Sequence, residues 1–248
     1  MRISVIACEI MFRELCLAAA ESPVVVDLHF LRKGLHDNPE VLREAVQERI
    51  DGADCAQTEA VVLGYGLCSN GTVGLRAGDL RLVVPRAHDC ITLFLGSRQR
   101  YARIFAERPG TYYYTSGWLE RGGDRTPQPP DKGGGLMDQA YEDLVAKYGE
   151  DNARYLMEFQ GHWRTNYTHA CYVRMPLSHR EEYREQVRQV AEENGWEYLE
   201  IEGDDALVRG MVSGDWDERD FLIVPPGQAV AASYDDCVLR CAAGGCQE

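Results

Sequence analysis

Three short apolar runs, each followed at once or within a few residues by side chains that can bind metals or attack electrophiles, constrain the fold most. They cover residues 3–7, 60–63 and 82–85. Runs of this length that lie between turn signals are typical of buried strands. Parallel strands end at the same edge of a sheet, and open α/β sheets bind ligands at their carboxyl edge. If these strands are parallel neighbours, the residues that follow them meet in one site.

The residues that follow the three runs are three cysteines, a histidine and two acids: Cys8, Glu9, Cys68, His88, Asp89 and Cys90. Thiolates and imidazole are the ligands that Zn²⁺ and iron–sulfur clusters select. The sequence therefore predicts a metal site with three thiolate ligands and His88 as a ligand or proton carrier. A tetrahedral zinc site would take His88 or Cys171 as its fourth ligand, whereas a cluster would leave one iron open. Alternatively, the thiols only fill the core.

The two acids have two interpretations each. Glu9 and Asp89 could orient a ligand or act as a general base near a substrate. Asp89 also stands directly before a predicted helix, where a carboxylate satisfies free backbone N–H groups. For Asp89 we prefer this cap.

Five further residues are candidates for binding a ligand or cofactor: Gly66, Asn70, Tyr113, Trp118 and Gln228. The first two belong to a glycine-rich loop that lets the backbone approach a ligand. The loop does not complete a dinucleotide-binding pattern, because residue 69 is serine. The two aromatic side chains could wall a pocket or pack between lobes. Gln228 is expected at a carboxyl edge that faces the cleft.

Apolar runs of strand length alternate with segments of helical spacing, which predicts an α/β fold with a mainly parallel sheet and helices on both faces. The expected strands are 2–7, 24–31, 59–66, 80–86, 170–175, 197–202 and 220–224. The expected helices are 11–20, 39–51, 91–107, 179–194 and 205–213, the second with Asn38 as its N-cap and the fourth with a capping box of Ser178 and Glu181.

Residues 120–135 contain five glycines and three prolines, a composition that favours a loop or hinge. We therefore expect two α/β lobes, residues 1–119 and 136–236. Residues 237–248 form a tail with Cys237, Cys241 and Cys246, whose spacing matches no standard metal site.

Composition excludes several classes of protein. The net charge of −14 argues against a nucleic-acid partner, which needs clustered Lys and Arg. Apolar runs fall short of the roughly 20 residues of a membrane span, and the N-terminus lacks the pattern of a signal peptide. Nine cysteines without a secretion signal favour free or metal-binding thiols. We expect a soluble cytoplasmic protein.

Several stretches, IACEI, GYGLCSNG, VPRAHDCITLFLGS, PGTYYYTSGW and GDWDERDFLIVPPGQ, resemble the domain of unknown function 1638 family over about residues 2–230. The genes of that family often lie beside corrinoid-dependent methyltransferases. The resemblance therefore implies a role near one-carbon metabolism, with a small-molecule substrate or a corrinoid protein as partner. The family's thiols fall on Cys8, Cys68 and Cys90.

Three functions follow from these residues. The leading hypothesis is a zinc- or iron–sulfur-binding protein of corrinoid methyl-transfer metabolism. The second is a metal-free enzyme with Cys90 or Cys68 as nucleophile and His88 as base. The third is a protein that delivers a metal or cofactor, with the terminal thiols as a transfer arm.

Overall fold

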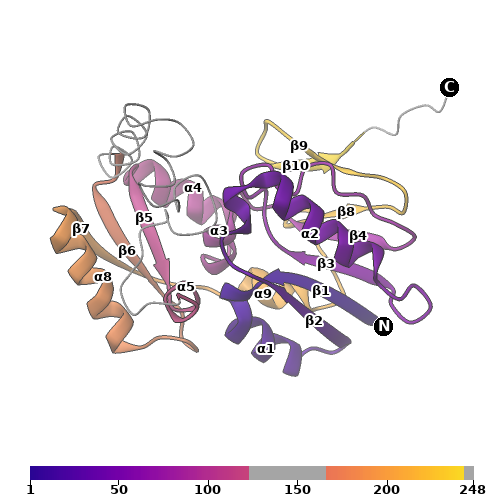
Figure 1. Ribbon diagram of the computed structural model, residues 1–248, viewed down its shortest axis with the longest axis horizontal. Helices are drawn as coiled ribbons and strands as arrows, with labels where there is room; N and C mark the ends of the chain where they lie inside the picture. The colour runs from indigo at the N-terminus through magenta and orange to yellow at the C-terminus, as the bar shows by residue number, and fades with distance from the viewer. Residues whose placement is uncertain (123–165, 243–248) are drawn as a thin grey trace, which may run out of the picture.

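The computed structural model describes residues 1–122 and 166–242. Its larger sheet has five strands in the order β2-β1-β3-β4-β8 (Figure 1). The strands are β1 (Arg2–Cys8), β2 (Val25–Leu31), β3 (Ala60–Gly64), β4 (Arg81–Pro85) and β8 (Phe221–Val224). The first four are parallel and β8 runs antiparallel to β4. The predicted α/β fold with a mainly parallel sheet is confirmed.

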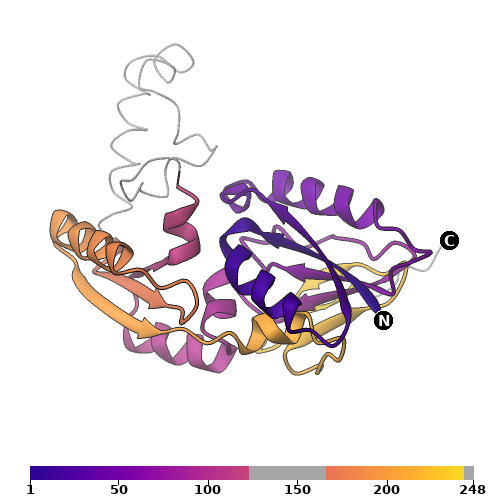
Figure 2. The ribbon, with the colours of Figure 1, turned by 90° about the horizontal axis from the view of Figure 1, so that it is seen from below.

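Helices cover both faces of this sheet, as the alternation of elements predicts. The chain passes from β1 through α1 (Phe12–Ala20) to β2 on one side, and then through α2 (Pro39–Asp51) to β3 on the other side. Right-handed crossovers in opposite directions place these helices on opposite faces. Figure 2 shows α2 on one side of the sheet, with α1 and α9 (Ala206–Met211) on the other.

Local sequence explains α2 well. Asn38 caps the helix, since its side-chain oxygen accepts hydrogen bonds from the amides of Glu40 and Val41 over 3.2 and 3.4 Å. Leu42, Val46 and Ile50 repeat every four residues, and all three are buried. The predicted cap and helix are confirmed.

A second sheet contains three parallel strands, β5 (Thr111–Thr115), β6 (His169–Arg174) and β7 (Glu197–Glu202). α8 (Glu181–Asn194) packs on β6 and β7, and α5 (Ser116–Glu120) follows β5. The strand β5 was not predicted, because its run of three tyrosines suggested a pocket wall instead of a strand.

The segments that form each of the two sheets do not coincide with the two expected lobes. β5 precedes the expected linker yet pairs with β6, whereas α9 and β8 follow β7 and return to the larger sheet. Residues 123–135 of that linker, and Cys246, lie outside the described residues. The chain therefore crosses between the sheets twice.

Three local predictions need correction. The expected helix 91–107 is two helices, α3 (Cys90–Phe94) and α4 (Arg98–Glu107), because Gly96 adopts a left-handed φ of 72° between them. The expected capping box is wrong, since α8 begins after Arg180 and Ser178 instead binds Glu14. Part of the expected tail is ordered, because β10 (Leu239–Cys241) pairs with β9 (Val230–Ala232).

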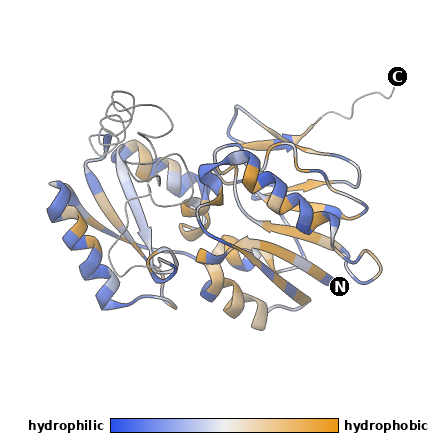
Figure 3. Cartoon of the chain, in the orientation of Figure 1, coloured by the Kyte–Doolittle hydropathy of each residue, from blue (hydrophilic) through white to orange (hydrophobic). Residues whose placement is uncertain are grey.

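The apolar core follows the larger sheet. β3 is buried throughout and β1 is buried except at Arg2, as expected for central parallel strands with helices on both faces. Figure 3 shows hydrophobic residues concentrated along these strands, while α8 is mainly hydrophilic. No helix in the described part of the chain is long and apolar enough to cross a membrane.

Candidate thiol site at the carboxyl edge of the larger sheet

The three strands predicted to carry the site, β1, β3 and β4, are parallel neighbours, which confirms the expectation on which the site rests. Cys8 ends β1, Cys68 lies four residues beyond β3, and Cys90 opens α3 after β4. The strand order reverses between β1 and β3, since β1 leads to β2 on one side and the chain returns to β3 on the other. Ligands of open α/β sheets bind outside the carboxyl ends of strands at such a switch point.

Backbone contacts fasten the loop after β3 to the loop after β4. The amide of Leu67 donates to the carbonyl oxygen of Ala87 over 2.7 Å, and the amide of Cys68 donates to that of His88 over 2.9 Å. A Cβ atom on Gly66 would lie 2.4 Å from the Ala87 oxygen. Gly66 is therefore needed for this close approach, which brings the two cysteine-bearing loops together.

The loop that carries Cys68 holds three consecutive residues in the left-handed region. The φ angles are 45° for Cys68, 55° for Ser69 and 66° for Asn70. This conformation costs a non-glycine residue roughly 1–2 kcal/mol, and residues held in it cluster at functional sites. This turn was not predicted, although a short Ser-Asn-Gly segment favours left-handed backbone.

Two of the three thiols are buried and the third is half-buried. Cys8 is 7% exposed and Cys68 is 8% exposed, whereas Cys90 is partly accessible. Burial raises the pKa of Cys8 to about 11 and that of Cys68 to about 12, and it raises the pKa of Cys90 well above its usual range. Asp89 and the other two thiols raise the pKa of Cys90 further, which places all three sulfur atoms within electrostatic reach.

Tyr65, which sequence analysis did not select, lies among these thiols. It follows β3 directly and is 4% exposed. Burial raises the pKa of Tyr65, and negative charge on Cys8, Cys68 or Cys90 would raise it further. Its position at the end of a buried strand was the signal that could have identified it.

His88 and Asp89 lie beside the thiols but face other partners. His88 is exposed, and its ring centroid lies 6.2 Å from that of Tyr101. Asp89 caps α3, accepting from the amide of Thr92 over 3.0 Å, and its other oxygen accepts from the Tyr101 hydroxyl over 3.1 Å. The preferred interpretation of Asp89 as a helix cap is confirmed.

Glu9 and Trp118 meet around a lysine next to Cys8. The Glu9 carboxylate accepts from the amide of Lys33 over 3.0 Å and lies 3.7 Å from the Arg121 guanidinium. The Lys33 ammonium lies 4.6 Å from the centre of the Trp118 ring and donates to the Trp118 carbonyl oxygen over 3.3 Å. Burial lowers the pKa of Lys33, whose charge in turn lowers the pKa of Cys8 slightly against the larger effect of burial.

The remaining candidates divide between the two sheets. Tyr113 of β5 faces Tyr101 with ring centroids 6.4 Å apart, and its hydroxyl is buried without a hydrogen-bond partner in the described residues. Cys171, the alternative fourth ligand, is buried in β6, in register with Tyr113. The exposed Asn70 has its carbonyl oxygen 3.5 Å from the side chain of Arg43 on α2.

The expected position of Gln228 is wrong. β8 runs antiparallel to β4, so Val224 pairs with Leu82 at the start of β4. Gln228 follows at the amino edge, opposite the thiols, where its carbonyl oxygen accepts from the amide of Ala77 over 2.9 Å. The sequence pattern of β8 carries no information about strand direction, which is why the prediction failed.

The chain matches the family described as "Protein of unknown function (DUF1638)" over residues 30–212, well over half of its length. It is a member of the DUF1638 family. No curated protein and no solved structure matches the chain. The matched range of this DUF1638 protein is shorter than the resemblance over residues 2–230. It includes Cys68 and Cys90 and begins after β1, which carries Cys8.

The thiols of the DUF1638 protein do not form a ready-made coordination sphere. Within residues 1–122 and 166–242, no three His, Cys, Asp or Glu side chains are arranged to hold one metal ion. The sulfur atoms therefore lie in one buried region without converging on one point.

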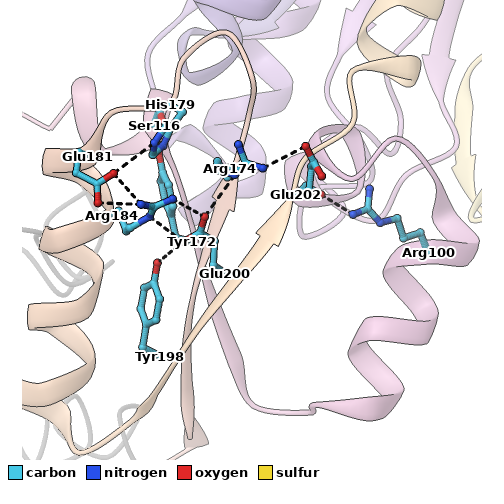
Figure 4. Close-up of polar contacts among 10 residues, drawn as sticks. All are labelled: Arg100, Ser116, Tyr172, Arg174, His179, Glu181, Arg184, Tyr198, Glu200 and Glu202. Atoms are coloured by element: carbon cyan, nitrogen blue, oxygen red, sulfur yellow. Dashed lines mark hydrogen bonds and ion pairs between the residues drawn. The ribbon is translucent and has the colours of Figure 1, made fainter.

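A second polar cluster lies on the smaller sheet (Figure 4). Arg184 donates to Glu181 over 2.8 Å and to Glu200 over 2.9 Å. The Tyr172 hydroxyl lies 2.8 Å from Ser116 Oγ and 3.2 Å from His179 Nδ1. Because the charges of these acids and bases compensate each other, we interpret the cluster as holding α8 on the smaller sheet. The candidate functional site is therefore the carboxyl edge of the larger sheet.

Proposed function

We propose that this DUF1638 protein binds a thiophilic metal ion or an iron–sulfur cluster through the thiolates of Cys8, Cys68 and Cys90. One observation carries the proposal: three thiols, two of them buried and the third half-buried, come from the carboxyl ends of three adjacent parallel strands, at the switch point of the sheet. Packing alone would not need three thiols from three separate loops at the edge where α/β proteins bind ligands.

The electrostatics favour a metal over a free thiolate nucleophile. A nucleophilic cysteine needs a lowered pKa, whereas burial raises the pKa of all three thiols. A bound cation would reverse this effect of burial on the pKa, because a coordinated thiol loses its proton and the positive charge of the metal stabilises the thiolate.

Binding requires the three sulfur atoms to move together, since the described residues do not hold them around one point. Three protein thiolates leave one position of a tetrahedral zinc ion, or one iron of a four-iron cluster, available for another ligand. A small-molecule substrate or a group on a corrinoid protein would occupy that position.

The wider setting rests on the resemblance stated above. A cytoplasmic protein that takes part in corrinoid-dependent methyl-transfer metabolism would use the open coordination position of its metal in one of two ways. It would either activate a methyl acceptor or assist the corrinoid partner. A delivery role for the metal remains the alternative, and Cys237 is exposed in the segment to which that role was assigned.

The test is metal content after anaerobic purification, measured by mass spectrometry together with the visible spectrum. Bound zinc without colour, or iron and sulfide with a brown absorbance, would support the proposal and identify the group. We expect Cys68→Ser and Cys90→Ser to lose it. Cys16→Ser, which changes a half-buried thiol on α1, should retain it. If Cys68→Ser and Cys90→Ser retain as much metal as the wild type, the proposal is wrong.

A further inference from the structure

One edge of the larger sheet is open at β2 (Figure 1). β2 pairs with β1 alone, and no backbone hydrogen bond joins its other edge to any residue in the described part of the chain. Proteins commonly protect such an edge from other strands with proline, lysine or a bulge. β2 contains no proline or lysine, and it pairs with β1 residue for residue without a bulge. The open edge of β2 is therefore able to pair with another strand.

The order of residues in β2 is complementary to itself. The strand reads VVDLHFL, with Leu28 at its centre. When two β2 strands pair antiparallel with Leu28 on a twofold axis, Asp27 of each copy lies opposite His29 of the other. Val26 likewise lies opposite Phe30, which makes an apolar pair. A twofold-symmetric interface requires this property, since every contact in it occurs twice with the partners exchanged.

The polar side chains of β2 are free to make the pairing. Asp27 and His29 lie on the side of the sheet that α2 covers, where they line one cavity together with Glu48 and Arg49. The two carboxylate oxygens of Asp27 each accept one hydrogen bond from Arg2, over 2.7 and 3.1 Å. A carboxylate oxygen can accept a second hydrogen bond, and an imidazole can donate one whether it is charged or neutral.

The other face of β2 carries an apolar stripe that α1 covers only in part. Val26, Leu28 and Phe30 pack against the core, yet each remains partly exposed. The rings of Phe30 and Phe12 of α1 have their centroids 5.2 Å apart, and Phe12 is 39% exposed. A second β2 strand would remove apolar surface of this stripe from water, which is favourable.

Charge distinguishes between the possible registers of such a pair. The two copies present the same face on the same side of the joined sheet, so only residues of one face lie opposite each other. An axis at Asp27 or at His29 would place that residue opposite its own copy, and like charges directly opposite each other are unfavourable. Of these three registers, the one centred on Leu28 brings the carboxylate and the imidazole together.

We propose that this DUF1638 protein forms a twofold-symmetric dimer in which two β2 strands pair antiparallel about Leu28 and join the two larger sheets into one. The partner at this edge is a second copy of the chain, because the strand is complementary to itself in both charge and apolar character. The dimer is independent of the proposed metal site, since Cys8, Cys68 and Cys90 lie on other elements or loops.

Sedimentation velocity of the intact protein tests the dimer. We expect a species with twice the mass of one chain that dissociates on dilution. His29→Asp and His29→Lys are a matched pair of variants at an exposed position. His29→Asp places carboxylates opposite each other twice in the dimer, so its Kd for dimerisation should rise by about tenfold or more. His29→Lys keeps a donor opposite Asp27 and should dimerise at least as tightly as the wild type.

Leu28→Lys tests the position of the axis. It places two ammonium groups next to each other on the axis and should leave a monomer, whereas Val41→Lys changes an exposed apolar residue of α2 and should leave the dimer intact. Circular dichroism checks that Leu28→Lys is folded. If Leu28→Lys does not fold, the two His29 variants decide the question.

Two results would overturn the dimer. A wild type that stays monomeric up to about 100 µM would show that the edge does not pair with its own copy, and would leave it to a strand of another protein. A wild-type dimer that His29→Asp does not weaken would place the interface on another surface of the molecule.

Discussion

The hydroxyl of Ser178 donates a hydrogen bond of 2.5 Å to the carboxyl group of Glu14. Both residues are buried, and the contact joins α1 on the larger sheet to the loop between β6 and α8 on the smaller sheet. The second oxygen of Glu14 has no hydrogen-bond partner in the described part of the chain. Burial raises the pKa of Glu14 above its ordinary value of 4.5.

This carboxyl group predicts a pH dependence of stability. A folded state with a raised carboxyl pKa holds the proton more tightly than the unfolded chain does. The stability that this tightly held proton adds to the folded state is therefore complete below pH 4.5. It is lost as the pH rises through the pKa of Glu14 in the folded protein. Glu14→Gln keeps the shape without the titration. We expect its free energy of unfolding, relative to the wild type, to increase between pH 4 and pH 8.

Urea denaturation at several pH values measures this difference. The control is Glu107→Gln, which changes an exposed carboxylate on α4 and should give a difference that does not vary with pH. A constant difference for Glu14→Gln would contradict a raised pKa for Glu14.

The contact between β1 and β3 predicts the effect of a single methyl group. In Gly64→Ala the new Cβ would lie 2.4 Å from the Cβ of Ala7 and 3.1 Å from Cε of Met11. Overpacking of this kind costs about 1–3 kcal/mol. Gly78→Ala is the control, since it meets no atom within 4 Å and is exposed. Thermal unfolding should show a lower Tm for Gly64→Ala alone, and equal Tm values would show that the strands can separate freely.

The left-handed turn after β3 predicts a stabilising substitution. Ser69 is exposed and has a φ of 55°, a conformation that glycine adopts without steric cost. Ser69→Gly should stabilise the metal-free protein by about 1 kcal/mol. Ser97→Gly, at a serine with a φ of −162°, should not. A loss of stability in Ser69→Gly would show that the serine side chain stabilises the turn more than its conformation costs.

Sequence predicted the parts of this protein that depend on neighbouring residues. Local patterns of polarity and propensity predict the cap at Asn38 and the helix that follows it. They also predict the buried strands β1, β3 and β4, and all of these elements are present in the structure. The meeting of Cys8, Cys68 and Cys90 followed from one general rule, that parallel strands end at one edge of a sheet.

The features that sequence missed depend on distant contacts. The direction of β8 is set by its pairing with β4, more than a hundred residues earlier in the chain, and this reversal moves Gln228 away from the site. The role of Ser178 depends on the buried Glu14 of α1, not on its own helix. Tyr65 follows a strand that the sequence predicts, but only the packing of the loops shows that it lies among the thiols.

The buried thiols finally predict their own reactivity. Because burial raises the pKa of Cys68 to about 12, this thiol holds much less thiolate at pH 8 than an ordinary thiol does. In the metal-free protein, iodoacetamide should therefore label the exposed Cys55 and Cys237 first and Cys68 and Cys90 last. Peptide mass spectrometry gives the order, and denatured protein, in which all thiols should react alike, is the control. Fastest labelling of Cys90 would reverse the argument, because only an activated thiolate reacts in that way, and the nucleophile hypothesis would replace the metal site.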